Sequence, residues 1–131
     1  MLTNETSVNL ASALSTFSDL WSPRIVTRVN DYDVRVAKVK GEYVWHSHEE
    51  TDEFFMVIEG ELTIGLRNGG VEHAVRLGRG DVYVVPKRRE HRPMSADGAS
   101  ILMFELTGTL TTGDYQGDLP DHIDSTSGHA L

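Results

Sequence analysis

The chain has 131 residues, the size of one ordinary domain, and 39% of them are hydrophobic while 24% are charged. It contains no cysteine, which excludes disulfides and thiolate metal sites and suits a cytoplasmic location. The net charge of −8, from 12 basic and 20 acidic residues, argues against binding to nucleic acid or an anionic membrane. We also expect no signal peptide, and no apolar run approaches the roughly 20 residues of a membrane span.

The first element that we expect is a helix. Apolar side chains recur three and four positions apart within residues 8–20, and Pro23 ends the pattern. Leu10, Leu14 and Phe17 form the apolar stripe of this helix. Such a stripe indicates a core or dimer contact rather than a ligand site.

From residue 25 the pattern changes to short β-prone runs separated by Gly, Pro and Asn turns. The expected strands are residues 25–30, 32–40, 42–46, 54–59, 61–67, 71–77, 81–85 and 101–106. Short strands with such turns predict an all-β sandwich or barrel.

We therefore divide the chain into three parts. Residues 1–24 form an N-terminal helical segment and residues 25–106 form the β-barrel. Residues 107–131 are rich in Gly, Thr and Asp, and they form a C-terminal extension that is either packed over the barrel or a loose tail.

Four residues in the predicted barrel are candidate metal ligands. His46 and His48 are two positions apart, so in an extended segment both imidazoles share one face. Glu53 follows after a turn, and His91 lies near the start of a later strand. Three imidazoles and one carboxylate suit one divalent ion of Fe, Mn, Ni, Cu or Zn. Four protein ligands around an octahedral ion leave two positions open, which is typical of catalytic sites.

These residues belong to two longer motifs that resemble those of the cupin family. The first motif runs from Gly41 through His46-Ser47-His48 and Glu53 to Gly60, and its opening spacer is one residue shorter than in the family. The second motif runs from Gly80 through Pro86-Lys87-Arg88 and His91 to Ser95. Here Arg88 stands where the family has glycine and Ser95 where it has asparagine, so the turn after Pro86 could be built differently.

The resemblance to small single-domain cupins implies a fold and a site. It implies a double-stranded β-helix of jelly-roll type, with a metal ion near one mouth of the barrel held by His46, His48, Glu53 and His91. It also implies a homodimer. Sequences of this kind are similar to mannose-6-phosphate isomerase-like cupins, although fold alone does not determine function.

Strand alternation predicts the direction of the neighbouring side chains. Counting from Glu53, Phe55 and Val57 face the interior, whereas Asp52, Phe54, Met56 and Ile58 face the other side. Counting from His46, Glu42 and Val44 face inward, and Tyr43 and Trp45 face away.

The remaining polar residues are weaker candidates. Glu105 is either an inward group near the metal or an exposed strand residue, and we expect exposure. We expect His73, His122 and His129 to be solvated. The basic run Lys87-Arg88-Arg89, with Arg92, is either a solvated loop or a device that steers an anionic substrate.

The function stays open between several hypotheses. The metal could polarise a carbonyl or hydroxyl group of a small oxygenated molecule, giving a sugar isomerase, epimerase or lyase. With Fe(II) the same set could support a dioxygenase. The barrel could also bind or sense a small molecule without turnover. We expect an enzyme, because four intact ligand positions indicate retained metal chemistry.

Overall fold

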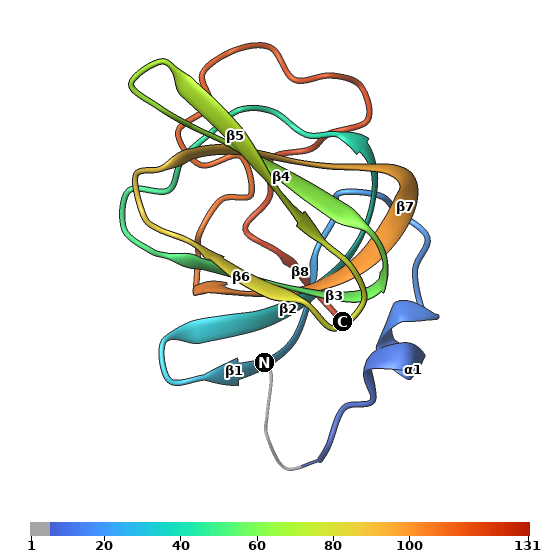
Figure 1. Ribbon diagram of the computed structural model, residues 1–131. Helices are drawn as coiled ribbons and strands as arrows, with labels where there is room; N and C mark the ends of the chain where they lie inside the picture. Colours follow the sequence, from blue (N-terminus) through green and yellow to red (C-terminus); the bar gives the residue numbers. More distant parts are fainter. Residues whose placement is uncertain (1–5) are drawn as a thin grey trace.

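The computed structural model of the protein describes residues 6–131 and consists of strands with one short helix (Figure 1). The elements are α1 (Leu10–Leu14), β1 (Arg24–Val29), β2 (Tyr32–Glu42), β3 (Glu53–Gly60), β4 (Leu62–Asn68), β5 (Val71–Leu77), β6 (Val82–Val85), β7 (Glu90–Leu106) and β8 (His129–Ala130). The predicted all-β jelly-roll barrel is confirmed. No helix within residues 6–131 is long and apolar enough to cross a membrane.

The long strand β7 organises the barrel, as its curved path in Figure 1 shows. Its first part pairs with β4, and its second part pairs with both β2 and β3. One layer is therefore β5-β4-β7, and the other contains β6, β3, β7, β2, β1 and β8. Because β7 belongs to both layers, the two enclose a common interior.

Alternating side chains divide the apolar residues between two cores. The interior core includes Phe55 and Val57 of β3, as predicted, together with side chains from β2, β4 and β7. A second cluster lies on the outer face of β1, β2, β3 and β7, and it includes Leu14 of α1 and Phe54 of β3. The helix thus covers the outside of the barrel, and its predicted apolar stripe contacts this outer core.

The strand predicted over residues 42–46 is wrong, since β2 ends at Glu42 and residues 43–45 are not part of a strand, and two further elements differ clearly in length. The helix ends at Leu14 instead of continuing to residue 20. The hydroxyls of Ser15 and Thr16 donate to the carbonyls of Ser12 and Ala13, and such bonds compete with a continuing helix. The strand predicted over residues 101–106 is the second part of β7, and the later strand expected near His91 is its first part, whose length was not predicted because polar residues interrupt its apolar pattern.

The C-terminal extension is packed over the barrel. Thr111, Thr112 and Ile123 are buried, and Ile123 belongs to the interior core. Near the end of the chain, β8 pairs with β1 in parallel. Residues 107–131 were expected either to pack over the barrel or to form a loose tail, and the structure favours packing over the barrel.

Candidate metal centre

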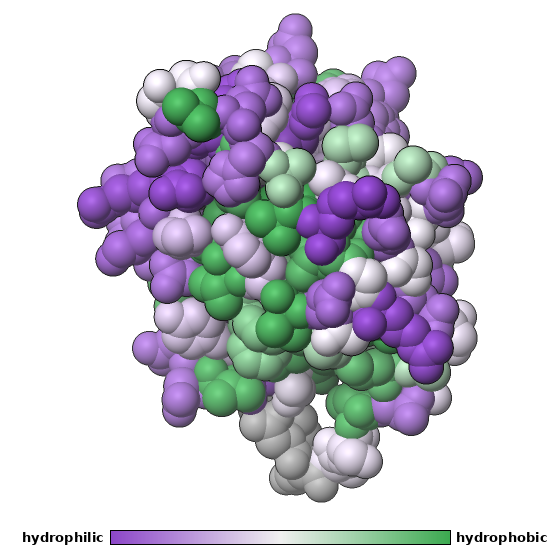
Figure 2. Space-filling view, viewed as in Figure 1, coloured by the Kyte–Doolittle hydropathy of each residue, from purple (hydrophilic) through white to green (hydrophobic). Residues whose placement is uncertain are grey.

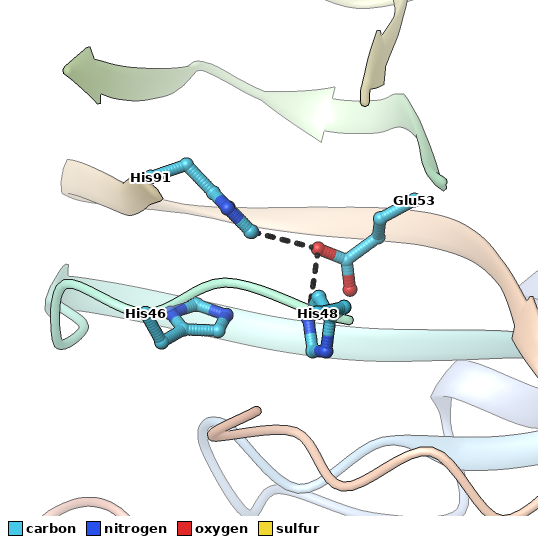
Figure 3. Close-up of side chains that lie close together, drawn as sticks. All are labelled: His46, His48, Glu53 and His91. Atoms are coloured by element: carbon cyan, nitrogen blue, oxygen red, sulfur yellow. Dashed lines mark hydrogen bonds and ion pairs between the residues drawn. The ribbon is translucent and has the colours of Figure 1, made fainter. Parts of the chain in front are cut away.

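The four candidate ligands come together inside the barrel (Figure 3). His46 and His48 lie in the segment between β2 and β3, Glu53 is the first residue of β3, and His91 is the second residue of β7. Their ligand atoms all lie within 4.8 Å of one another. All four side chains are buried, with exposed fractions of at most 4%.

Backbone pairing places two of the imidazoles side by side. The amide of His46 donates to the carbonyl of His91 over 3.1 Å, and the amide of His91 donates to the carbonyl of His46 over 2.9 Å. This isolated antiparallel bridge joins segments that are far apart in the sequence. As a result, the two ring centroids lie 4.3 Å apart.

Hydrogen bonds to carbonyl oxygens determine the tautomers of two histidines. Nδ1 of His46 lies 2.8 Å from the carbonyl of Val44, and Nδ1 of His91 lies 2.9 Å from the carbonyl of Arg89. A carbonyl can only accept, so both Nδ1 atoms carry the proton. In the neutral rings, both Nε2 atoms therefore keep a free lone pair, as metal ligands require.

The charges at the centre favour a cation. Burial lowers the pKa of His46 to about 3, so this ring is neutral at neutral pH. Burial would raise the pKa of Glu53, but the imidazoles of His48 and His91, whose Nε2 atoms lie 3.5 and 3.0 Å from its Oε1, lower it well below its ordinary value. The centre therefore contains one carboxylate among imidazole rings, each of which can act as a neutral ligand.

Two observations show that these residues fit a divalent ion. Nε2 of His91 and Oε1 of Glu53 are 3.0 Å apart, and with Nδ1 protonated both atoms are acceptors that need a cation or a proton between them. Nε2 of His48 is buried without a hydrogen-bond partner among residues 6–131. Nitrogen and oxygen ligands lie about 2 Å from such ions, which agrees with the close spacing of the four groups.

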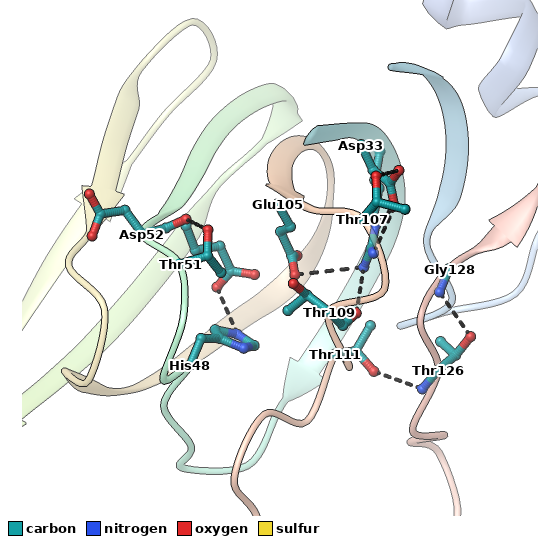
Figure 4. Close-up of polar contacts among 12 residues, drawn as sticks. Asp33, His48, Thr51, Asp52, Glu105, Thr107, Thr109, Thr111, Thr126 and Gly128 are labelled. Carbon is teal, nitrogen blue, oxygen red and sulfur yellow. Dashed lines mark hydrogen bonds and ion pairs between the residues drawn. The ribbon is translucent and has the colours of Figure 1, made fainter. Parts of the chain in front are cut away.

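Glu105 was expected to be exposed, and this prediction is wrong. It is 1% exposed and faces the interior (Figure 4). The register that pairs Phe54 with Phe104 brings Glu105 level with Glu53, and Asp33 of β2 lies opposite Glu105 on its other side. Alternation from Ile101, which is buried in the core, would have predicted this direction.

The carboxyl groups of Glu53, Glu105 and Asp33, which lie side by side on β3, β7 and β2, differ in pKa. Burial and the neighbouring charge of Glu53 raise the pKa of Glu105 well above its ordinary value. Burial would also raise the pKa of Asp33, but hydrogen bonds from Thr107, Arg35 and Arg28 lower it. Arg35 Nη1 lies 3.6 Å from Oε2 of Glu105. Glu105 therefore keeps its proton to a higher pH than Glu53 does.

A small interior chamber of about 30 Å³ adjoins the centre. Most of its walls are apolar or aromatic, and the polar groups that face it come from the centre, Tyr43, Glu105 and Thr111. Burial raises the pKa of Tyr43, so its hydroxyl stays protonated. By the usual measure, a chamber of this size admits a group of two or three non-hydrogen atoms.

Alternation predicted that Tyr43 faces away and that Glu42 faces inward, and both predictions are wrong. Tyr43 is buried in the interior, whereas Glu42 is exposed and pairs with Arg92. The cause is a register shift beside Gly41 (φ +82°), after which residues 43–45 are not part of a strand. Val44 is buried as predicted. Trp45 also faces away as predicted, and Arg67 stacks on its ring at 4.2 Å.

An open groove of about 430 Å³ lies on the other side of His48. Its charged lining residues are Glu49, Glu50 and Asp114. The basic loop brings little free positive charge to this groove, since Arg88 pairs with Glu49 at 3.2 Å. The groove therefore favours uncharged or cationic molecules over anionic ones.

The other sequence candidates lie away from the centre. Asp52 is exposed and accepts a hydrogen bond from the amide of Lys87, so it faces outward as predicted. His73, His122 and His129 are exposed, as predicted.

Comparisons with known proteins agree with this architecture. The cupin domain family matches residues 33–106. A cupin-2 domain containing protein from Shewanella frigidimarina is 40% identical, with a TM-score of 0.71, and the match covers 76% of this chain and 93% of that one.

Two curated proteins match shorter parts of the chain. The uncharacterised protein YdbB of Bacillus subtilis is 44% identical over 70 residues, 53% of this chain and 59% of that protein. A 3-hydroxyanthranilate 3,4-dioxygenase from Xanthomonas oryzae is 27% identical over 60 residues, 46% of this chain and 34% of that enzyme. The chain thus matches less than two thirds of the length of either protein.

Proposed function

This chain belongs to the cupin family, and we propose that it is a metal-dependent enzyme whose single divalent ion is bound by His46, His48, Glu53 and His91. The observation that carries this proposal is the contact of two buried acceptors, Nε2 of His91 and Oε1 of Glu53, only 3.0 Å apart. A shared cation is the simplest way to satisfy both, and it also satisfies the unpartnered Nε2 of His48.

The protein's own groups would bind and orient a small substrate around that ion. A bound ion supplies an electrophilic centre and, in the case of iron, the means to react with dioxygen. The groove beside His48 would admit the substrate, and the chamber would receive a group of two or three atoms. The Tyr43 hydroxyl and the Glu105 carboxyl would donate hydrogen bonds to that group, while apolar walls exclude water.

We propose dioxygenase chemistry on a small oxygenated molecule as the leading reaction. The mostly apolar chamber suits dioxygen or an apolar ring edge better than a sugar, whose hydroxyls need many polar partners. The sequence match to a 3-hydroxyanthranilate dioxygenase supports the same direction.

The isomerase or lyase alternative also has one specific observation in its favour. The pKa of Glu53 is lowered and that of its neighbour Glu105 is raised, and two carboxyl groups with separated pKa values are what a proton transfer requires. Binding or sensing without turnover is the third outcome that the experiment must distinguish.

The experiment uses metal-free protein reloaded separately with Fe(II), Mn(II), Ni(II), Cu(II) and Zn(II). Each form is assayed for dioxygen uptake with phenols, diketones and keto acids, and for mass-neutral conversion of sugars. Metal-dependent dioxygen uptake with a product that contains both oxygen atoms would support a dioxygenase. Mass-neutral conversion would select the isomerase, and ligand binding without turnover would select the sensor. The His91→Ala variant is the inactive control in every arm.

The homodimer and the cytoplasmic location remain predictions. On the face shown in Figure 2, apolar residues gather near the centre and polar residues surround them. A shallow groove of about 290 Å³ on the outer surface is lined by Val29, Tyr32, Phe54, Val84 and Phe104. If two copies associate through this groove, Val84→Lys should convert a dimer to a monomer in light scattering.

A further inference from the structure

We propose that Asp114 and Gly113 are positioning residues for the metal centre, because they hold the peptide that joins His46 to His48. This inference rests on the proposed metal function. It assigns a role to the C-terminal extension, which lies outside the part of the chain that the cupin family matches, residues 33–106.

Asp114 makes three hydrogen bonds with Ser47, the residue between the two histidines. The amide of Ser47 donates to Oδ1 of Asp114 over 2.7 Å, and the Ser47 hydroxyl donates to Oδ2 over 2.9 Å. In the reverse direction, the amide of Asp114 donates to the Ser47 carbonyl over 3.0 Å. All the backbone polar groups of Ser47 are therefore engaged by one residue that lies 67 positions away.

Gly113 brings the two segments into close contact. Its φ of +52° is in the left-handed region, and a Cβ at this position would collide with the Ser47 carbonyl oxygen. The same Cβ would lie 3.2 Å from Cδ2 of the His46 ring. The absence of a side chain at this position thus allows the extension to lie directly against the ligand segment.

We call the contacts of Asp114 and Gly113 with Ser47 the clamp. The imidazoles of His46 and His48 depend on it to different degrees. His46 has its own hydrogen bond from Nδ1 to the Val44 carbonyl, which orients the ring. His48 has no such bond to a carbonyl; its Nε2 lies 3.5 Å from Oε1 of Glu53 but has no hydrogen-bond partner among residues 6–131. The direction of His48 therefore depends on its backbone, which Ser47 holds on one side and the amide of Arg88 holds on the other, over 2.7 Å.

A purely structural role for Asp114 would be to anchor the extension. However, the extension has other anchors: β8 pairs with β1, and His122 lies within hydrogen-bond distance of the Glu42 carbonyl. Thr112 and Ser125 also bond to each other within the extension. Loss of the Asp114 side chain should therefore loosen Ser47 while the extension stays in place.

The test is titration of metal-free protein with Co(II), followed by its visible absorption. We expect Asp114→Ala to weaken Co(II) affinity about 10- to 100-fold, the usual effect of removing a partner that orients a ligand, and to change the absorption spectrum. Ser47→Ala keeps the backbone hydrogen bond and should give a smaller loss. Ser125→Ala is the matched control that loosens the extension only, and it should leave affinity and spectrum unchanged.

Asp114→Asn separates the clamp from a simple effect of charge. An asparagine side chain can accept from the Ser47 amide and donate to its hydroxyl, so the geometry survives without the negative charge. We expect near-wild-type affinity and spectrum for this variant. A loss as large as that of Asp114→Ala would overturn the clamp in favour of charge attraction.

Two further outcomes are decisive. Wild-type affinity and spectrum in Asp114→Ala would overturn this inference and leave the metal function intact. Absence of Co(II) binding by the wild-type protein would overturn the metal function and this inference together. If Asp114→Ala does not fold, the Co(II) affinities of Asp114→Asn and Ser47→Ala still distinguish the two explanations. A larger loss in Asp114→Asn than in Ser47→Ala would favour charge attraction, and near-wild-type affinity in Asp114→Asn would favour the clamp.

Discussion

The most direct perturbation of the metal centre is removal of His91. Its ring is 1% exposed and its Nε2 lies 3.0 Å from Oε1 of Glu53, so the His91→Ala variant loses a buried ligand atom next to the carboxylate. A metal ion that binds only the folded state stabilises it by RT ln(1 + [M]/Kd), about 2.7 kcal/mol at one hundred times Kd. For a domain of this size, that corresponds to an increase of about 10 °C in the melting temperature.

Thermal unfolding of metal-free protein with and without Zn(II) measures this increment. We expect an increase of about 10 °C for the wild-type protein and little or none for His91→Ala. The metal-free variant will also be less stable, because it loses a buried ring, and for this reason the comparison uses only the increment. His73→Ala, which removes an exposed imidazole on β5, is the control and should keep the full increment. An equal increment in wild type and His91→Ala would refute the ligand assignment.

Three other predictions concern pH and packing. Burial lowers the pKa of His46 to about 3, so between about pH 6.5 and pH 3 the unfolded state binds a proton that the folded state does not. The free energy of unfolding of the metal-free protein should therefore fall as the pH falls over this range. In urea unfolding, this fall should be less steep for His46→Gln. Burial raises the pKa of Glu105, so the stability of the wild-type protein falls as this group loses its proton at rising pH. Glu105→Gln cannot lose that proton, so the stability of the variant minus that of wild type should be larger at pH 8 than at pH 4. The same difference at both pH values would contradict this. Gly60→Ala should destabilise the protein by roughly 2–5 kcal/mol, because its Cβ would collide with the Gly98 carbonyl. Gly69→Ala has open space around it and should cost only about 1 kcal/mol in the same urea assay.

The sequence predicted the strands well wherever apolar and polar residues alternate. The inward positions of Phe55 and Val57 and the outward position of Phe54 follow from alternation alone. The prediction was wrong where the backbone departs from a regular strand, as it does beside Gly41, because residues 43–45 are not part of a strand and strict alternation does not hold there. Tyr43 therefore reached the interior although alternation placed it outside.

The candidate ligands could be chosen from the sequence because their chemistry and spacing are local features. Glu105 was missed because its direction depends on which face of β7 is buried, which only the pairing with β2 and β3 decides. Asp114 could not be found at all, since nothing in a Gly-, Thr- and Asp-rich extension indicates which acid contacts Ser47. Contacts between segments 67 residues apart depend on how the whole chain folds.

Two of the three departures from the cupin motifs show what those motif positions specify. Arg88 stands at a glycine position and still adopts a left-handed φ of +69°, so the turn after Pro86 keeps its shape without glycine. Ser95 stands at the asparagine position, where its hydroxyl donates to the Glu61 carbonyl over 2.6 Å and accepts from the Gly98 amide. Positions 88 and 95 therefore shape and bind the backbone, and residues other than glycine and asparagine can do this. The groups that would meet a substrate, such as Tyr43 in the chamber, lie outside these turns, so family membership indicates where a metal ion would bind but not which reaction would follow.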